Sequence, residues 1–379
     1  MVFHRTLPGS SPIVWNWAAA GKAASRAANR GRILLYTIGA KVAIQPQKIK
    51  FWLTLCLRMK GRVLIPLMLL AALLPAGCRR AAQAPAAPRL RAFPYPEIPA
   101  VYVDAAERQD WFLDHFWDPF FAGDGPCDTG AVLGVPYHEV EIQVASYAGL
   151  LQQLPLPEAQ RRMRHFFAQV EQRQAADTAS RVFLQLEEIV SRYLYDPNSP
   201  VRDEDLYLPY VEGLARSRFT REDARPGYEY QRRMCALAPV GSVAPDFRFT
   251  DARGRSRRLH DVKARATLLF FSNPGCYACK EIIDALQAVP GMEERIRRGG
   301  FAVVNVYIDE DLAAWRAYEP NYPRSWLCGY DPDGLVRSDR IYNVRAIPSL
   351  YLLDADKRIL MKDAPVERVV SWLQNRQNQ

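Results

Sequence analysis

Acidic residues are missing from the first quarter of this chain. No Asp or Glu precedes Glu97, whereas eleven Lys or Arg residues lie within residues 1–77. Without these eleven residues the formal net charge of +9 would become slightly negative, so the basicity belongs to the N-terminal segment. A basic composition would otherwise suggest nucleic acid or anionic lipid as a partner. Because the segment shows no interleaving of aromatic and basic residues, we expect no nucleic-acid partner.

The apolar run in this segment is too short to cross a membrane. Met59–Arg62 is a positively charged stretch, and the twelve residues Val63–Leu74 that follow are apolar. As a helix these twelve residues would span about 18 Å, well short of the roughly 30 Å hydrocarbon core. The pattern therefore favours a signal peptide over an uncleaved membrane anchor.

Small residues precede a cysteine directly after this run. Pro75, Ala76 and Gly77 lead to Cys78, in the pattern at which bacterial lipoproteins are cleaved and lipidated, although Pro75 stands where Leu is usual. We therefore predict a lipoprotein signal peptide over 59–77 and lipidation at Cys78. Met59 would then be the true start, and residues 1–58 a gene-start artefact or dispensable extension. The Ala/Pro-rich segment 78–99 is expected to be an extended tether.

The rest of the chain divides into two regions. Residues 100–236 show helical periodicity throughout and predict an all-α domain. From about residue 240 to 379, strand-like and helix-like segments alternate, which predicts a mixed sheet with helices on both faces. The expected helices are 137–153, 157–173, 178–195, 203–216 and 223–237, after a capped start at Asp104, and the expected strands include 266–271, 301–308, 350–353 and 358–361.

Two cysteines one helical turn apart carry the chemistry. Cys276 and Cys279 follow the apolar strand Ala266–Phe271 and the turn Ser272–Gly275, and they open a predicted helix. Free backbone N–H groups and the helix dipole at such a position favour an anion and lower the pKa of the first thiol. We expect Cys276 to attack a substrate sulfur and Cys279 to resolve the mixed disulfide.

A C-x-x-C pair can also bind zinc or form a structural disulfide. A zinc site would need a second Cys/His pair at ligand spacing, and only the isolated His260 and Cys328 lie in the same region. His115, His138 and His165 fall on separate predicted helices, so no metal site is predicted. A purely structural disulfide stays open, because a C-x-x-C motif alone does not prove turnover.

Several motifs together resemble the TlpA/ResA branch of the thioredoxin-like fold. They are residues 244–249, residues 268–271, the C-x-x-C pair and residues 346–354. The resemblance implies that Pro348 is a cis-proline facing the cysteines and that the backbone of Ile347 pairs with the substrate chain. Taken alone, Pro348 could also begin an edge strand. We also expect Tyr277 and Ala278, between the cysteines, to contact the substrate.

The chain departs from the family pattern near the cysteines. Gly275 stands where Trp is frequent, the pair encloses no Pro, and Phe270 occupies the position of the buried acid in thioredoxins. Glu281 is one position away from an acid seen in some relatives. The general base therefore cannot be assigned from the sequence. The helical region more loosely resembles one of unknown function that precedes thioredoxin domains in some bacterial lipoproteins, on residues 94–99, 115–118 and 198–200.

The sequence as a whole predicts an α+β protein, with an all-α domain followed by a thioredoxin-like α/β domain. Its expected function is that of a lipid-anchored thiol-disulfide oxidoreductase of the cell envelope, facing the periplasm or exterior. The partners would be exported proteins and an upstream membrane redox protein, and no cofactor is needed because the dithiol holds the electrons. A non-catalytic binding lipoprotein and a peroxide reductase remain as alternatives; the residues before Cys276 lack the Thr that peroxide chemistry needs.

Overall fold

The computed structural model describes residues 90–338 and 340–376. The predicted extension, the signal peptide, Cys78 and residues 79–89 of the tether lie outside the described residues. The tether prediction is wrong for the described residues 91–95, because Phe93 is 5% exposed in the helical core and its backbone N–H donates to Glu139. Within them, every helix is too short or too polar to cross a membrane.

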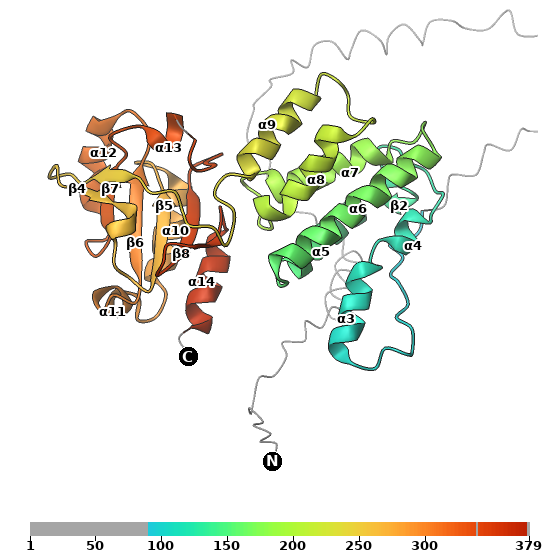
Figure 1. Ribbon diagram of the computed structural model, residues 1–379, viewed down its shortest axis with the longest axis horizontal. Helices are drawn as coiled ribbons and strands as arrows, with labels where there is room; N and C mark the ends of the chain where they lie inside the picture. The colour runs from blue at the N-terminus through green and yellow to red at the C-terminus, as the bar shows by residue number, and fades with distance from the viewer. Residues whose placement is uncertain (1–89, 339, 377–379) are drawn as a thin grey trace, which may run out of the picture. The chain divides into compact units, whose positions relative to one another are not determined.

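Helices dominate the first half of the described chain, as the periodicity predicts (Figure 1). The first begins where expected, because Asp104 is its N-cap and accepts hydrogen bonds from the backbone N–H groups of Ala106 and Glu107. The helices are α3 (Ala105–Asp114), α4 (Asp118–Phe121), α5 (Tyr137–Leu151), α6 (Leu156–Ala176), α7 (Val182–Val190), the π-helix η2 (Ser191–Tyr195), α8 (Glu204–Arg216) and α9 (Arg225–Cys235).

A single apolar core holds these helices together. In α6 the buried residues Met163, Phe166, Phe167 and Val170 recur at helical spacing and form one face. Gly213 on α8 lies directly opposite this face, since a Cβ atom there would come within 2.3 Å of the Phe167 ring. The glycine therefore allows α8 to pack closely on α6.

The helical segment also contains a small hairpin that the sequence did not indicate. Strands β1 (Ala131–Val132) and β2 (Val135–Pro136) pair in antiparallel fashion. The two residues between them, Leu133 and Gly134, both have positive φ, which matches the tight turn that joins twisted strands. Strands of two residues are too short to give a period.

The second half is built on one seven-stranded mixed sheet, with strand order β4-β3-β7-β6-β5-β8-β9. Strand β5 is buried along its whole length and lies between β6, which is parallel to it, and β8, which is antiparallel. Such a continuous apolar run is expected of a strand covered on both faces. The strands are β3 (Arg248–Thr250), β4 (Ser256–Arg258), β5 (Ala266–Phe271), β6 (Ala302–Tyr307), β7 (Leu327–Tyr330), β8 (Ser349–Asp354) and β9 (Ile359–Met361).

Helices cover both faces of this sheet (Figure 1). On one face, α10 and α14 contribute Ile282, Leu286, Val369 and Leu373 to the core. On the other face, Val336 of α13 packs with Phe271 and Val304. The helical elements are η3 (Leu259–Asp261), α10 (Tyr277–Gln287), α11 (Met292–Arg297), α12 (Leu312–Tyr318), η4 (Glu319–Asn321), α13 (Leu335–Ser338) and α14 (Val366–Asn375).

The sequence pattern does not indicate the short elements β7, η3, α11, η4 and α13. Strand β7 contains Gly329, which weakens the strand signal in the sequence. In the fold this glycine is required, because a Cβ atom would lie 2.8 Å from the Phe249 ring of β3. The predicted fold class is nevertheless confirmed.

Candidate redox site

The loop after β5 delivers Cys276 to the start of α10. Gly275 takes a positive φ of 70°, which turns the chain into the helix. Cys276 is the N-cap residue, and its Sγ accepts a hydrogen bond from the backbone N–H of Cys279 at 3.1 Å. The sulfur thus lies where the helix offers unpaired N–H groups and the positive end of its dipole.

The two cysteines form a disulfide, with their Cα atoms 5.2 Å apart. They differ in access to solvent: Cys276 is half-buried, whereas Cys279 is 2% exposed and packs in the core. Tyr277 between them is 77% exposed, and Ala278 is exposed as well. An incoming sulfur can therefore reach Cys276 more easily than Cys279.

The Ile347–Pro348 peptide bond is cis, as the family resemblance implied. Both residues are half-buried. The next residue, Ser349, is the register partner of Phe271 at the end of β5. The loop before β8 and the loop that carries Cys276 therefore lie side by side at one end of the sheet.

The structure shows what lies at Phe270 and near Glu281, the two places where the family pattern suggests an acid. Phe270 is fully buried on the side of β5 that faces α10, in the same core cluster as Cys279. Glu281 is exposed, and the neighbouring Ile282 points into the core instead. Neither position places a carboxylate beneath the disulfide.

Neutral polar groups lie near the end of β5 instead. Ser272 donates a hydrogen bond from Oγ to Asn305 Oδ1 at 2.6 Å, and its Oγ is 3.2 Å from the Tyr322 hydroxyl. All three side chains are buried, and burial raises the pKa of Tyr322. Sequence reasoning missed this set, although Asn305 is the one polar residue within the apolar strand β6.

Side-chain contacts also hold the loop Ser272–Gly275, which precedes Cys276, against neighbouring segments. Asn273 donates to Asp309 Oδ2 at 2.6 Å, and Asp309 Oδ1 is 2.7 Å from the Arg337 guanidinium. This chain of contacts joins the loop before Cys276 to the loop after β6 and to α13. Its members come from three separate segments, so no local motif reveals it.

Comparisons with known proteins agree with this geometry. Two family models match in succession, a domain of unknown function (DUF5106) over residues 76–230 and the AhpC/TSA family over residues 240–361. The crystal structure of a thioredoxin-like protein from Bacteroides caccae is 31% identical, with a TM-score of 0.63, and the match covers 76% of this chain and 99% of that one. The chain belongs to the thioredoxin-like family.

Two curated relatives of this thioredoxin-like protein are thiol-disulfide oxidoreductases named ResA. That of Geobacillus kaustophilus is 25% identical over 126 residues, which are 32% of this chain and 66% of the relative. That of Bacillus thuringiensis subsp. konkukian is 25% identical over 124 residues, 32% of this chain and 68% of the relative. The chain thus spans about two thirds of the length of these relatives. The predicted family and enzyme class, a thioredoxin-like oxidoreductase, are confirmed.

Three further cysteines among the described residues are free thiols. Cys235 and Cys328 are buried thiols and Cys127 is half-buried. Burial raises the pKa of Cys328 to about 12 and also raises that of Cys235. In residues 90–376 apart from 339, no cluster of three or more His, Cys, Asp or Glu side chains could hold a metal ion.

Proposed function

We propose that this thioredoxin-like protein exchanges disulfides with cysteines of exported proteins. Cys276 is the attacking residue and Cys279 resolves the mixed disulfide. The observation that carries the proposal is the unequal placement of the two sulfurs, one at the helix N-terminus and half-buried, the other 2% exposed in the core. Exchange chemistry needs an accessible nucleophile and a sheltered second thiol.

Reduction of a substrate disulfide takes two exchange steps. The Cys276 thiolate attacks one sulfur of a substrate disulfide, forms an enzyme–substrate S–S bond and releases the other substrate sulfur as a thiolate. Cys279, once deprotonated, then attacks Cys276, and the second substrate sulfur leaves. Two electrons pass from the dithiol to the substrate. An upstream membrane redox protein would return them, and the same steps in reverse would oxidise a substrate dithiol.

The substrate chain would dock beside the cysteines on the loop before β8. The proximity of the Ile347–Pro348 peptide to the end of β5 supports this assignment, as does the exposure of Tyr277 and Ala278. A backbone segment pairing with Ile347 would bring its own cysteine toward Cys276. Tyr277 would supply apolar contact area without demanding a particular sequence.

A position in the cell envelope is part of the proposal. It rests on the signal-peptide pattern over 59–77 and on the small residues before Cys78. A lipid on Cys78 would hold the enzyme at a membrane, and the Ala/Pro-rich residues 79–89 would link the lipid to the folded part.

The match to the AhpC/TSA family raises peroxide reduction as a second candidate. The loop Ser272–Gly275 before Cys276 lacks Thr, which argues against it. A peroxide-consumption assay with the reduced protein distinguishes the two functions, because a disulfide exchanger should consume peroxide no faster than a small dithiol does.

A redox titration against glutathione tests the proposed function. A catalytic Cys276–Cys279 couple should equilibrate with the glutathione pool, at a potential above about −300 mV. A couple that stays oxidised below that potential would indicate a structural disulfide and would contradict the proposal.

A further inference from the structure

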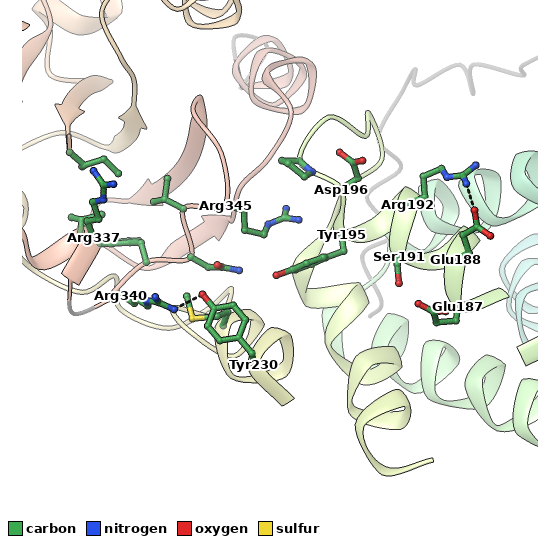
Figure 2. Close-up of a pocket in the computed structure, with 17 residues that line it drawn as sticks. Glu187, Glu188, Ser191, Arg192, Tyr195, Asp196, Tyr230, Arg337, Arg340 and Arg345 are labelled. Atoms are coloured by element: carbon green, nitrogen blue, oxygen red, sulfur yellow. Dashed lines mark hydrogen bonds and ion pairs between the residues drawn. The ribbon is translucent and has the colours of Figure 1, made fainter. Parts of the chain in front are cut away.

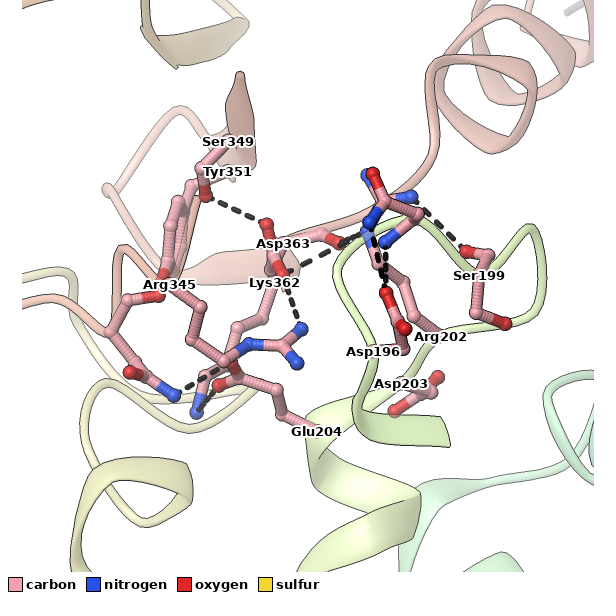
Figure 3. A network of polar contacts seen from close by, with 12 residues as sticks. Asp196, Ser199, Arg202, Asp203, Glu204, Arg345, Ser349, Tyr351, Lys362 and Asp363 are labelled. Carbon is pink, nitrogen blue, oxygen red and sulfur yellow. Dashed lines mark hydrogen bonds and ion pairs between the residues drawn. The ribbon is translucent and has the colours of Figure 1, made fainter. Parts of the chain in front are cut away.

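A cluster of buried charged side chains connects the start of α8 with the loop that contains Pro348 (Figure 3). We call residues 343–349 the cis-Pro loop. The exposed side-chain fractions are 0% for Glu204, 8% for Arg345, 1% for Lys362 and 5% for Asp363. The helical segment contributes Glu204, and the thioredoxin-like segment contributes the other three.

Glu204 contacts the first part of the cis-Pro loop. Its Oε1 lies 2.7 Å from Arg345 Nε and accepts a hydrogen bond from Asn343 Nδ2, also at 2.7 Å. Its Oε2 lies 3.0 Å from Lys362 Nζ, which also donates to the carbonyl oxygen of Cys235. One carboxylate therefore joins α8 to two segments of the sheet domain.

Asp363 holds the far end of the same loop. Its Oδ2 accepts from Arg345 at 2.6 Å, and its Oδ1 accepts from Ser349 Oγ at 2.8 Å. Ser349 directly follows Pro348. The backbone carbonyl oxygen of Asp363 accepts a further hydrogen bond from Arg202 Nε at 3.0 Å, so a second residue of the helical segment reaches this cluster. The cis peptide is thus fixed on both sides by one charged network.

Arg345 is also held from the side. Its guanidinium lies 4.4 Å from the centre of the Tyr195 ring at the end of η2. The two residues line a cavity of about 800 Å³ between the helical segment and the cis-Pro loop (Figure 2). Neither Cys276 nor Cys279 lines this cavity. The contact of the helical segment with Arg345 therefore lies on the cis-Pro loop and not at the cysteines.

Stability alone does not account for such a cluster. Desolvating buried charges costs several kcal/mol per ion, and apolar residues of similar volume often stabilise a core as well or better. Hydrogen bonds between charged groups depend strongly on geometry. A network of them therefore fixes the position of the backbone segment that carries these groups. The segment fixed here is the one on which a substrate chain would dock.

We propose that Glu204 is a positioning residue through which the helical segment sets the cis-Pro loop for docking of a polypeptide substrate. This inference rests on the proposed function. It assigns the helical segment a part in substrate recognition, acting at the loop rather than on the thiol chemistry. Substrates too small to pair with Ile347 should not depend on Glu204.

The test compares a large and a small disulfide on the full chain. Glu204→Gln removes the charge and keeps the shape, and the KM for reduction of insulin disulfides should rise about tenfold, since a small misplacement of a docking group has effects of this order or larger. The rate with the small disulfide DTNB and the potential of the Cys276–Cys279 couple should stay unchanged. Backbone amides of residues 343–349 should exchange hydrogen faster.

Asp203→Asn is the matched control. Asp203 lies next to Glu204 and pairs with Arg368 of α14 at 3.1 Å, outside the cis-Pro loop, and Asn can still cap α8. This variant should behave as the wild type. If Glu204→Gln does not fold, Ser349→Ala, which loses only the contact with Asp363, should raise the insulin KM in the same direction.

Two results would overturn the inference while leaving the proposed function intact. One is an unchanged insulin KM in folded Glu204→Gln or, where that variant fails to fold, in Ser349→Ala. The other is an equal rise of KM in Asp203→Asn. Wild-type protein that reduces no insulin would instead contradict the proposed function and the inference with it.

Discussion

The backbone N–H of Cys279 donates a hydrogen bond to Cys276 Sγ across the first turn of α10, at 3.1 Å. This contact makes the two sulfurs chemically unequal. A thiolate at Cys276 would accept the same hydrogen bond and would lie at the positive end of the helix, whereas Cys279 is enclosed by the core.

Alkylation of the reduced protein should reveal this difference. In Cys279→Ser, iodoacetamide should modify Cys276 with a pH midpoint below the value of about 8.5 for a free thiol, because only the thiolate reacts. Peptide mass spectrometry at a series of pH values gives the midpoint. A midpoint at or above 8.5 would show that the helix terminus does not activate this sulfur.

The buried thiols should behave in the opposite way. Burial raises the pKa of Cys328 to about 12 and raises that of Cys235, so neither should be alkylated within minutes at pH 8 in the folded protein. In concentrated urea both should react fully. Rapid labelling of either cysteine without denaturant would contradict their placement in the core.

Asp205 should make the protein less stable as pH rises. This side chain is 3% exposed, and burial raises its pKa to about 7, although Lys362 partly opposes the shift. Between about pH 4 and 7 the unfolded chain has lost this proton while the folded chain keeps it, so this contribution to stability falls with rising pH and levels off above 7.

Asp205→Asn removes that dependence. Near pH 4 the variant should resemble the wild type, and at pH 8 it should be more stable by up to roughly 4 kcal/mol, the equivalent of three pKa units. Urea unfolding at pH 4.5, 6 and 8 measures the difference. A constant offset between the two proteins across this range would show that Asp205 does not hold a proton in the folded state.

Membrane attachment should depend on Cys78. Cys78→Ser in an exporting host should leave the protein soluble or unprocessed, since the lipidated cysteine is lost. A chain that begins at Met59 should mature identically to the full chain and serves as the control. Unchanged membrane attachment of the Cys78→Ser protein would exclude a lipid anchor at this site.

The sequence was most informative where one physical requirement acts locally. The apolar run Ala266–Phe271, in which only Thr267 is polar, predicts the central strand, and the position of Cys276 after a turn predicts its place at a helix start; both agree with the structure. The family resemblance implied the cis bond at Pro348. Each of these features depends on a few neighbouring residues.

The sequence did not predict side-chain contacts between segments that are far apart along the chain. Glu204 and Arg345 are ordinary charged residues in the sequence, where such residues are usually on the surface. Their burial becomes evident only once α8 and the cis-Pro loop are side by side. In the same way, Asn305 and Tyr322 join Ser272 only through the sheet, and no periodicity indicates this pairing.

Trapping of substrates by single-cysteine variants tests the central claim most directly. Cys279→Ser keeps the nucleophile and removes the resolving thiol, so exported proteins should accumulate as mixed disulfides on Cys276, visible as reducible bands on non-reducing gels and identified by mass spectrometry. Cys276→Ser should trap little or nothing. Equal trapping by both variants would contradict the roles assigned to the two cysteines, and no trapping by either would indicate a structural disulfide.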